Sequence, residues 1–425
     1  MKFEDRLKSF ERFISNRKVE KPKDSSDLSL TEYLEGVEVE NIYGKCLKVD
    51  KEFTLNFCHG QILISDGLKY EGQTIAKFTC DEKLSSFDPQ RTVFLDTETT
   101  GLAGGTGTYP FLVGIGFFEE DKFRIRQYFM RDFNEEKALL YFLQNDLKQF
   151  ASLVTYNGKC FDAPLLNTRF TFNRIDFSFD NFLHLDLLFP SRRLWKLRLK
   201  ECSLSNLEMK VLGVFRLSDI PSYMVPQAYF NYLNSGEIEP LKKILDHNTN
   251  DILSLVGLSI FSAKIIEDPE SAGINDPQDL FSLGKIYTNL REYQKGMLCL
   301  EKAWLNAPDE GFKLKIGEFL AWQYKRIGEW EKAEKIWKAL SSDSGGDKLR
   351  PYFRKEPLVF YPYEELAKYY EHKVKDYSLA LEMVDKALKL IASSLGLGED
   401  KRLREIERRF CHRKERLKRK LLKNI

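Results

Sequence analysis

Acidic side chains occur in three separate segments of this sequence, at positions where a core pattern would not place them. The first segment, FLDTETTG, carries Asp96 and Glu98 two residues apart, so both point to one face of an extended strand. The second, TYNGKCFDAPLL, carries Asp162 just after an apolar run. The third, HNTNDILSL, carries His247 and Asp251 four residues apart, so they share one face of a helix.

Converging carboxylates of this kind predict a metal centre. Four acids that meet repel one another and destabilise the fold unless cations neutralise them. Carboxylate oxygens without a cysteine or histidine cluster suit Mg²⁺ or Mn²⁺ better than zinc. Two such ions about 4 Å apart are the usual arrangement for in-line cleavage of a phosphodiester bond. The pattern therefore predicts two bound divalent ions and hydrolysis of nucleic acid.

The elements that would position these acids follow from apolar periodicity. Apolar or alternating runs predict strands at 92–98, 111–118, 123–130, 152–157 and 182–189. Helical spacing predicts helices at 134–150, from FDAPLLNTRF onward, and at 238–266. The order β-β-β-α-β-α-β is typical of the α/β ribonuclease H-like fold, a mixed sheet flanked by helices.

Three motifs in this order, DxETTG, NxxxFDxPxL and HxxxD, resemble those of the DEDD 3′→5′ exonuclease superfamily. The second motif looks most like that of family-B DNA polymerases. The longer strings FLDTETTGLAGGTGTYPFLVGIGFF, RRLWKLRLKECSLSNLE and HNTNDILSL are still more similar to the YprB-like ribonuclease H-like domain family, which often carries tetratricopeptide repeats. The resemblance covers about residues 85–266.

The resemblance implies a role for each acid. Asp96, Glu98 and Asp251 would bind the catalytic metal, and Asp162 would help to hold the second metal, partly through water. His247 would be the general base that accepts a proton from the attacking water. The sequence departs from the family here, because His-x3-Asp combines the histidine of one branch with the spacing of the tyrosine branch. The geometry of the base therefore stays open, as does exonuclease against endonuclease action.

Structural roles compete with these assignments. Asp162 could be only a helix N-cap with Pro164 in the first turn, and His247 could be a partly buried hydrogen-bonding residue. Asp186, in HLDLLF, is expected to cap or support rather than to bind metal. The glycines of GLAGGTG, residues 101–107, could admit a nucleic-acid backbone or make a tight hairpin.

A basic segment, SRRLWKLRLKE, could bind nucleic acid. Phosphate contacts combined with a stacking aromatic side chain would suit a single strand, and an ordinary solvated helix face is equally compatible with the pattern. The candidate nucleic-acid-binding residues are Asn157, Arg192, Arg193, Trp195 and Lys196.

The chain divides into several expected regions. They are a flexible arm at 1–25, a small accessory region at 26–91, the ribonuclease H-like domain at 92–268, helical repeats at 269–400 and a basic helix or tail at 401–425. The repeat region places small and aromatic residues at offsets 0, 3, 9 and 12, with one extra residue in the third copy. This pattern resembles tetratricopeptide repeats, which usually hold protein partners. Its residues are Gly284, Tyr287, Tyr293, Gly296; Ala321, Tyr324, Trp330, Ala333; and Ala367, Tyr370, Tyr377, Ala380.

Charge and composition narrow the function classes. The 425 residues carry a net charge of +2, yet residues 401–425 hold twelve Lys and Arg against three Glu. This tail could bind nucleic acid non-specifically, dock a partner or be disordered. Seven scattered cysteines indicate a reducing cytoplasm, and we expect neither a membrane span nor a signal peptide. The sequence thus predicts a cytoplasmic, metal-dependent 3′→5′ exonuclease. The competing interpretation is a nucleic-acid-binding scaffold with a weak or inactive nuclease-like domain.

Overall fold

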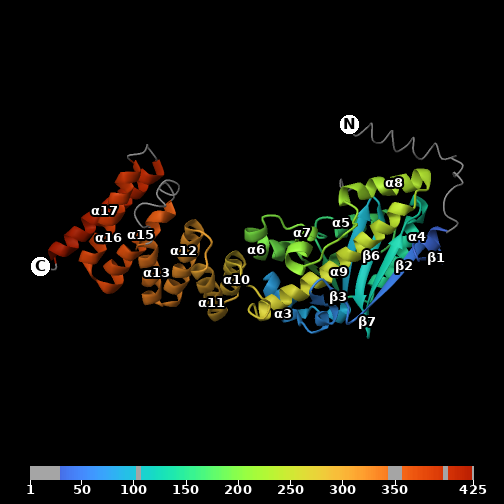
Figure 1. The fold of residues 1–425 in the computed structure, drawn as a ribbon, viewed down its shortest axis with the longest axis horizontal. Helices are drawn as coiled ribbons and strands as arrows, with labels where there is room; N and C mark the ends of the chain where they lie inside the picture. The colour runs from blue at the N-terminus through green and yellow to red at the C-terminus, as the bar shows by residue number, and fades with distance from the viewer. Residues whose placement is uncertain (1–28, 102–106, 343–356, 396–400, 424–425) are drawn as a thin grey trace. The chain divides into compact units, whose positions relative to one another are not determined.

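The computed structural model describes residues 29–101, 107–342, 357–395 and 401–423 (Figure 1). The chain forms two compact units. The first contains residues 1–193 and 201–272, and the second contains 194–200 and 273–425. The expected arm at 1–25 and two of the four GLAGGTG glycines lie outside the described residues.

A seven-stranded mixed sheet forms the centre of the first unit, in the order β1-β2-β7-β6-β5-β8-β9. The pairs β5–β8 and β8–β9 are parallel, and the other neighbours are antiparallel. This arrangement confirms the predicted mixed sheet. In that order, the strands span Val37–Asn41, Gly44–Thr54, Lys122–Phe129, Pro110–Phe118, Thr92–Thr99, Ser152–Thr155 and Leu183–Asp186.

Residues 26–91 do not form the separate accessory region that the sequence predicts, because part of this segment belongs to the central sheet. Its strands β1 and β2 extend the central sheet, and β2 pairs with β7 from Leu47 opposite Phe129 to Thr54 opposite Lys122. Cys46, Leu47 and Val49 belong to the main hydrophobic core. The sequence signal was missed because glycine and charged residues interrupt these short apolar runs. The same region also forms a two-stranded hairpin, β3 (Cys58–His59) and β4 (Ile62–Leu63).

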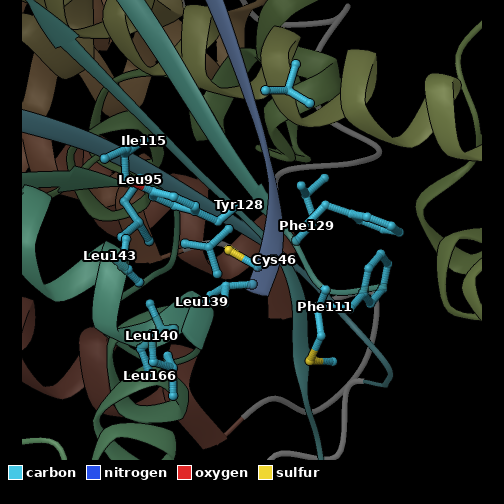
Figure 2. Packing of buried hydrophobic residues seen from close by; sticks show 14 of the residues in the cluster. Cys46, Leu95, Phe111, Ile115, Tyr128, Phe129, Leu139, Leu140, Leu143 and Leu166 are labelled. Atoms are coloured by element: carbon cyan, nitrogen blue, oxygen red, sulfur yellow. The ribbon is translucent and has the colours of Figure 1, made fainter. Parts of the chain in front are cut away.

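Helices cover both faces of the sheet. Gly114 and Gly116 of β6 face α9 (Glu239–Glu267), where an added Cβ would meet Asn248 and Ile252. Ile115, between these glycines, points to the opposite face and lies near α4 (Glu136–Leu147) in the core (Figure 2). The other helical segments of this unit are α2 (Leu30–Tyr33), η1 (Ile64–Leu68), α3 (Gly72–Thr79), η2 (Glu82–Ser86), η3 (Pro89–Arg91), η4 (Phe133–Glu135), α5 (Asp162–Phe172), η5 (Phe179–Asn181), α7 (Leu204–Leu207), η6 (Glu208–Leu212), η7 (Ser222–Met224) and α8 (Val225–Ser235).

The strand predicted at 182–189 is shorter than expected. β9 ends at Asp186, and α6 (Leu188–Leu199) begins two residues later. The Asp186 carboxylate accepts the backbone N–H of Leu188 at 3.1 Å, which favours a helix start at this point. Residues 194–200 of α6 belong to the second unit, so the predicted boundary at 268/269 omits them.

Among the described residues, α9 is the one helix long and apolar enough to cross a membrane. However, 78% of its most apolar window is buried inside the structure, which is the pattern of a core helix.

The second unit is made of helices packed one after another. Gly284 and Gly296 let α10 and α11 approach closely, because a Cβ on either glycine would lie 3.1–3.2 Å from the carbonyl of the other. The extra residue of the third copy coincides with the π-helical turn η9, a common way to accommodate an insertion. The elements are α10 (Pro277–Asn289), α11 (Tyr293–Leu305), α12 (Glu310–Ile327), α13 (Trp330–Ser342), η8 (Pro357–Phe360), α15 (Tyr361–Tyr369), η9 (Tyr370–Val374), α16 (Tyr377–Leu395) and α17 (Lys401–Lys423).

Candidate metal centre

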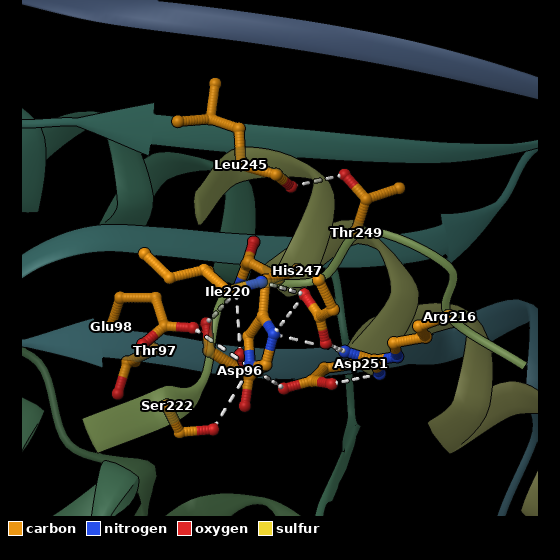
Figure 3. A network of polar contacts seen from close by, with 12 residues as sticks. Asp96, Thr97, Glu98, Arg216, Ile220, Ser222, Leu245, His247, Thr249 and Asp251 are labelled. Carbon is orange, nitrogen blue, oxygen red and sulfur yellow. Dashed lines mark hydrogen bonds and ion pairs between the residues drawn. The ribbon is translucent and has the colours of Figure 1, made fainter. Parts of the chain in front are cut away.

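The end of β5 carries two of the predicted acids. Asp96 and Glu98 lie on one face of the strand, and the pairing with β6 shifts register between Glu98 and Thr99. The strand faces α9, which carries His247 and Asp251 one helical turn apart (Figure 3). Strand β5 and helix α9 therefore bring together residues that are about 150 positions apart in the sequence.

Three side chains come close enough to share one ion. His247 Nε2 lies 3.8 Å from Glu98 Oε1 and 3.5 Å from Asp251 Oδ2. One ligand atom from each of the three residues falls within 4.8 Å of the others. The two carboxylate oxygens suit Mg²⁺ or Mn²⁺, whereas an imidazole nitrogen suits softer metals, so the acids would hold a hard ion and leave Nε2 of His247 beside it.

Asp96 lies beside this group and is held by a buried amide. Asn248 Nδ2 donates to Asp96 Oδ2 at 2.7 Å, and Gln127 Nε2 donates to Asn248 Oδ1 at 2.8 Å. Asn248 is completely buried, and it fits only because Gly114 has no side chain. A Cβ at Gly114 would lie 2.0 Å from Asn248 Oδ1. This chain of amides fixes the direction of the Asp96 carboxylate.

A second acid orients His247. Its Nδ1 lies 2.8 Å from Asp219 Oδ1 and 3.2 Å from Arg216 Nη1. With the proton on Nδ1, the ring donates to Asp219 and leaves Nε2 facing Glu98 and Asp251. Ser222 Oγ lies 3.4 Å from Nε2.

Arg216 supplies a positive charge inside the acidic cluster. Its guanidinium donates to Glu208 Oε1 and Asp251 Oδ1, and it reaches Asp219 Oδ2 at 3.0 Å. The Arg216 side chain is 10% exposed and that of Glu208 is 2% exposed, so this ion pair is largely removed from water. Oδ1 of Asp251 is thus occupied by arginine, whereas Oδ2 faces His247.

The electrostatics of the cluster remain unfavourable despite this arginine. Burial, followed by the charge of Asp251, raises the pKa values of Asp96 and Glu98 well above their ordinary range. Other carboxylates add to the rise in both pKa values, so the acids repel one another. A site of this kind gains free energy by binding a cation.

Asp162 stands apart from the three-residue group. It starts α5, and its Oδ1 accepts the Thr97 hydroxyl at 2.5 Å. Burial raises the pKa of Asp162 to about 6, and the Thr97 hydrogen bond opposes that rise. The structure therefore places Asp162 against the strand that carries Asp96 and Glu98, and the charge of Asp162 raises the pKa values of both.

Asp186 has the supporting role expected from the sequence. Its carboxylate accepts the backbone N–H groups of Asn157 at 2.7 Å, Lys159 at 3.0 Å and Leu188 at 3.1 Å. Asn157 has a left-handed backbone with φ of 64°. Asp186 thereby holds the turn that leads from β8 to Asp162.

The predicted nucleic-acid-binding residues of α6 separate into different roles. Trp195 is completely buried, so the expected stacking on a base is wrong. Arg193 Nη1 donates to the carbonyl oxygens of Thr79 at 2.8 Å and Phe78 at 3.4 Å, which caps the end of α3. Arg192 and Lys196 are exposed and remain candidates for phosphate contacts.

Sequence reasoning missed four polar residues of the centre. Arg216 and Asp219 come from a segment without clear periodicity, and Glu208 comes from a short helical turn. Asn248 stands inside the HNTND motif itself. One signal was available, because a strand as apolar as FLVGIGFF has little reason to contain Gly114 unless a neighbour approaches closely.

Comparison with known proteins agrees with this geometry. The sequence profile of the RNase_H superfamily matches residues 93–260. "Uncharacterized protein YprB" of Bacillus subtilis (strain 168) is 32% identical over 347 residues, which are 81% of this chain and 80% of that protein. This chain belongs to the YprB family. The match extends beyond the first unit of this YprB-family chain, and the mixed sheet with its flanking helices is the ribonuclease H-like fold.

Proposed function

We propose that this YprB-family protein is a metal-dependent nuclease that removes nucleotides from a 3′ end by a two-metal mechanism. The observation that supports this most is the meeting of Glu98, His247 and Asp251 beside Asp96 at the end of β5. Membership of the RNase_H superfamily points to the same reaction class.

The residues would divide the work as follows. Asp96, Glu98, Asp162 and Asp251 would hold two Mg²⁺ or Mn²⁺ ions. When bound, the ions would neutralise the acids, polarise the scissile phosphate and stabilise the leaving oxygen. Asp251 would use Oδ2 for this purpose while Arg216 holds Oδ1 in place.

His247 would act as the general base. Its Nε2 faces the acids, and Asp219 fixes the ring through Nδ1. A proton taken from the attacking water at Nε2 would create an imidazolium, and the nearby Asp219 carboxylate would stabilise that charge. The Asp219 contact thus offers a route to base catalysis despite the unusual His-x3-Asp spacing.

Exposed aromatic side chains favour a substrate with unpaired bases. Phe161, next to Asp162, is 53% exposed, and Tyr223, next to Ser222, is 81% exposed. Stacking on aromatic rings binds single strands with little sequence preference. We therefore expect Tyr223→Ala to raise KM for a single-stranded substrate several-fold, and Tyr223→Phe to leave it unchanged.

A panel of end-labelled substrates tests the proposal. Single-stranded and duplex DNA and RNA are incubated with Mg²⁺ or Mn²⁺, with Asp96→Asn as the control variant. Stepwise shortening from the 3′ end, release of nucleoside 5′-monophosphates and intact circular single strands would support exonuclease action. Cleavage of circles would indicate an endonuclease instead. Equal absence of activity in both proteins would contradict the proposal.

A scaffold role is the second candidate, and Arg216 is the observation that favours it. Because this arginine already neutralises Asp251, the acids could persist in a protein that binds nucleic acid without cutting it.

In either case the helical unit is a candidate site for a protein partner. We also propose a cytoplasmic location, since all seven cysteines are free thiols.

A further inference from the structure

Helix α17 is an amphipathic helix with one buried face and one basic face. Leu403, Ile406, Phe410 and Leu417 are at most 5% exposed, and the helix packs mainly on α16. The expected basic tail is therefore a packed element of the second unit, and its apolar face is already covered. Insertion of that face into a lipid surface would require the unit to open.

The positive charge of α17 exceeds the charge that its neighbours supply. Glu371 of η9 alone binds Arg413 at 2.7 Å, Arg416 at 2.6 Å and Lys420 at 2.9 Å. Asp385 pairs with Lys414 at 2.7 Å, and Glu364 pairs with Arg409. Three acids from other elements, Glu364, Glu371 and Asp385, therefore form ion pairs with α17. With the helix's own three Glu, six carboxylates meet twelve Lys and Arg. Cations therefore outnumber these acids two to one.

The basic face is also hollowed. A hollow of about 370 Å³ is lined by Glu364, Arg408, Arg409, Phe410, His412 and Arg413. Arg409 is 59% exposed in its side chain, and its ion pair with Glu364 is long, at 3.7 Å. Arginine side chains around a concave surface are suited to phosphate oxygens, which accept several N–H groups at once.

We propose that the exposed face of α17 binds the sugar–phosphate backbone of single-stranded nucleic acid. The exposed cations include Arg404, Arg408 and Arg409, which lie within two turns of this one helix. This binding needs no metal and no residue of the acidic centre. It adds to the proposed nuclease function a second grip on the polymer, located in the other unit of the chain.

The test is binding without cleavage. Full-length protein carrying Asp96→Asn is titrated with a fluorescent single-stranded oligonucleotide in EDTA at several salt concentrations. The α17 variant replaces Arg404, Arg408 and Arg409 with Gln. The matched control replaces three lysines of the same unit with Gln. They are Lys295, Lys332 and Lys338, whose side chains are 47%, 56% and 59% exposed.

Three lost phosphate contacts reduce the slope of log affinity against log salt by about 2, and the affinity at 0.1 M salt by about 100-fold. We expect this change in the α17 variant and a much smaller one in the control. An unchanged slope in the α17 variant would overturn the proposal. Equal losses in both variants would mean unspecific attraction and would overturn it as well.

Two further features of the experiment distinguish nucleic acid from a membrane surface as the ligand, and distinguish this proposal from the proposed nuclease function. If the α17 variant loses binding to anionic vesicles but keeps binding to the oligonucleotide, the face serves a membrane surface and the proposal fails. Because binding is measured in EDTA, a failure of the nuclease proposal would leave the α17 result unchanged.

Discussion

Replacing Arg216 with Met removes the built-in positive charge of the acidic centre. The substitution keeps a similar apolar stem but leaves Glu208, Asp219 and Asp251 without their shared partner. Removing one partner of a buried ion pair costs about 3–5 kcal/mol, because the remaining charge stays out of water. The low exposure of Glu208 and Arg216, 2% and 10%, places this pair in that range. We expect the free energy of unfolding to fall by about that amount in EDTA.

Divalent ions should recover part of this loss. An ion present at 100 times its Kd stabilises a protein by about 2.7 kcal/mol, and the variant should bind Mn²⁺ more tightly because Oδ1 of Asp251 becomes free. Mn²⁺ should therefore stabilise Arg216→Met more than the natural protein. A loss below about 1 kcal/mol in EDTA, or equal stabilisation of both proteins by Mn²⁺, would refute the reasoning.

The assay uses urea unfolding followed by two signals. All five tryptophans lie in the second unit, so their emission follows this helical unit, while hydrogen exchange of α9 follows the acidic centre. Arg216→Met should alter α9 exchange and leave the tryptophan transition in place. Lys242→Met is the matched control, because Lys242 lies on α9, whose exchange is followed, and its pair with Glu35 is exposed. We expect a change of less than about 1 kcal/mol there.

Two other predictions concern the base and the pH dependence. Asp219→Asn should lower kcat by about 10- to 100-fold at unchanged Mn²⁺ affinity, since the Asp219 carboxylate holds His247 and Arg216 rather than a proposed metal ligand. A matching loss of Mn²⁺ affinity would make Asp219 part of the metal site. Burial raises the pKa of Asp162 to about 6, so between about pH 4 and 6 the metal-free folded state keeps a proton that the unfolded chain has lost. The stabilisation that this protonation gives to the folded state therefore shrinks as pH rises and is lost once pH passes through 6. Buried His59 and His184, with pKa values lowered to about 4, contribute the opposite trend, so the comparison is with Asp162→Asn. The urea midpoint of the natural protein should fall more between pH 5 and 7 than that of the variant, and parallel curves would contradict this.

Local sequence patterns were sufficient for much of the fold. The strands at 92–98, 111–118 and 123–130 and the helix carrying His247 are found where periodicity predicts them, because long apolar runs leave few alternatives. Asp96 and Glu98 were visible as acids at the end of such a run. Their proximity to Asp251 followed from the order of elements.

Other features depend on contacts between distant residues and have no local signal. Pairing of β2 with β7 joins residues about 75 positions apart. The role of Arg216 depends on Glu208, Asp219 and Asp251, which meet only in the folded chain. Trp195 appeared in a basic segment and suggested stacking on nucleic acid, yet burial in the second unit decides its position. The sequence shows that such charged and aromatic residues are present, but it does not show which residues they contact in the folded chain.

The central claim is that acids from β5 and α9 bind the divalent ions that drive cleavage. The most direct test measures the rate at which a 5′-labelled single strand shortens as Mn²⁺ is titrated, in the natural protein and in Glu98→Gln. We predict saturable, Mn²⁺-dependent shortening in the natural protein and a rate at least 100-fold lower in Glu98→Gln at every Mn²⁺ concentration. Cleavage that continues unchanged in Glu98→Gln, or in EDTA, would contradict the claim.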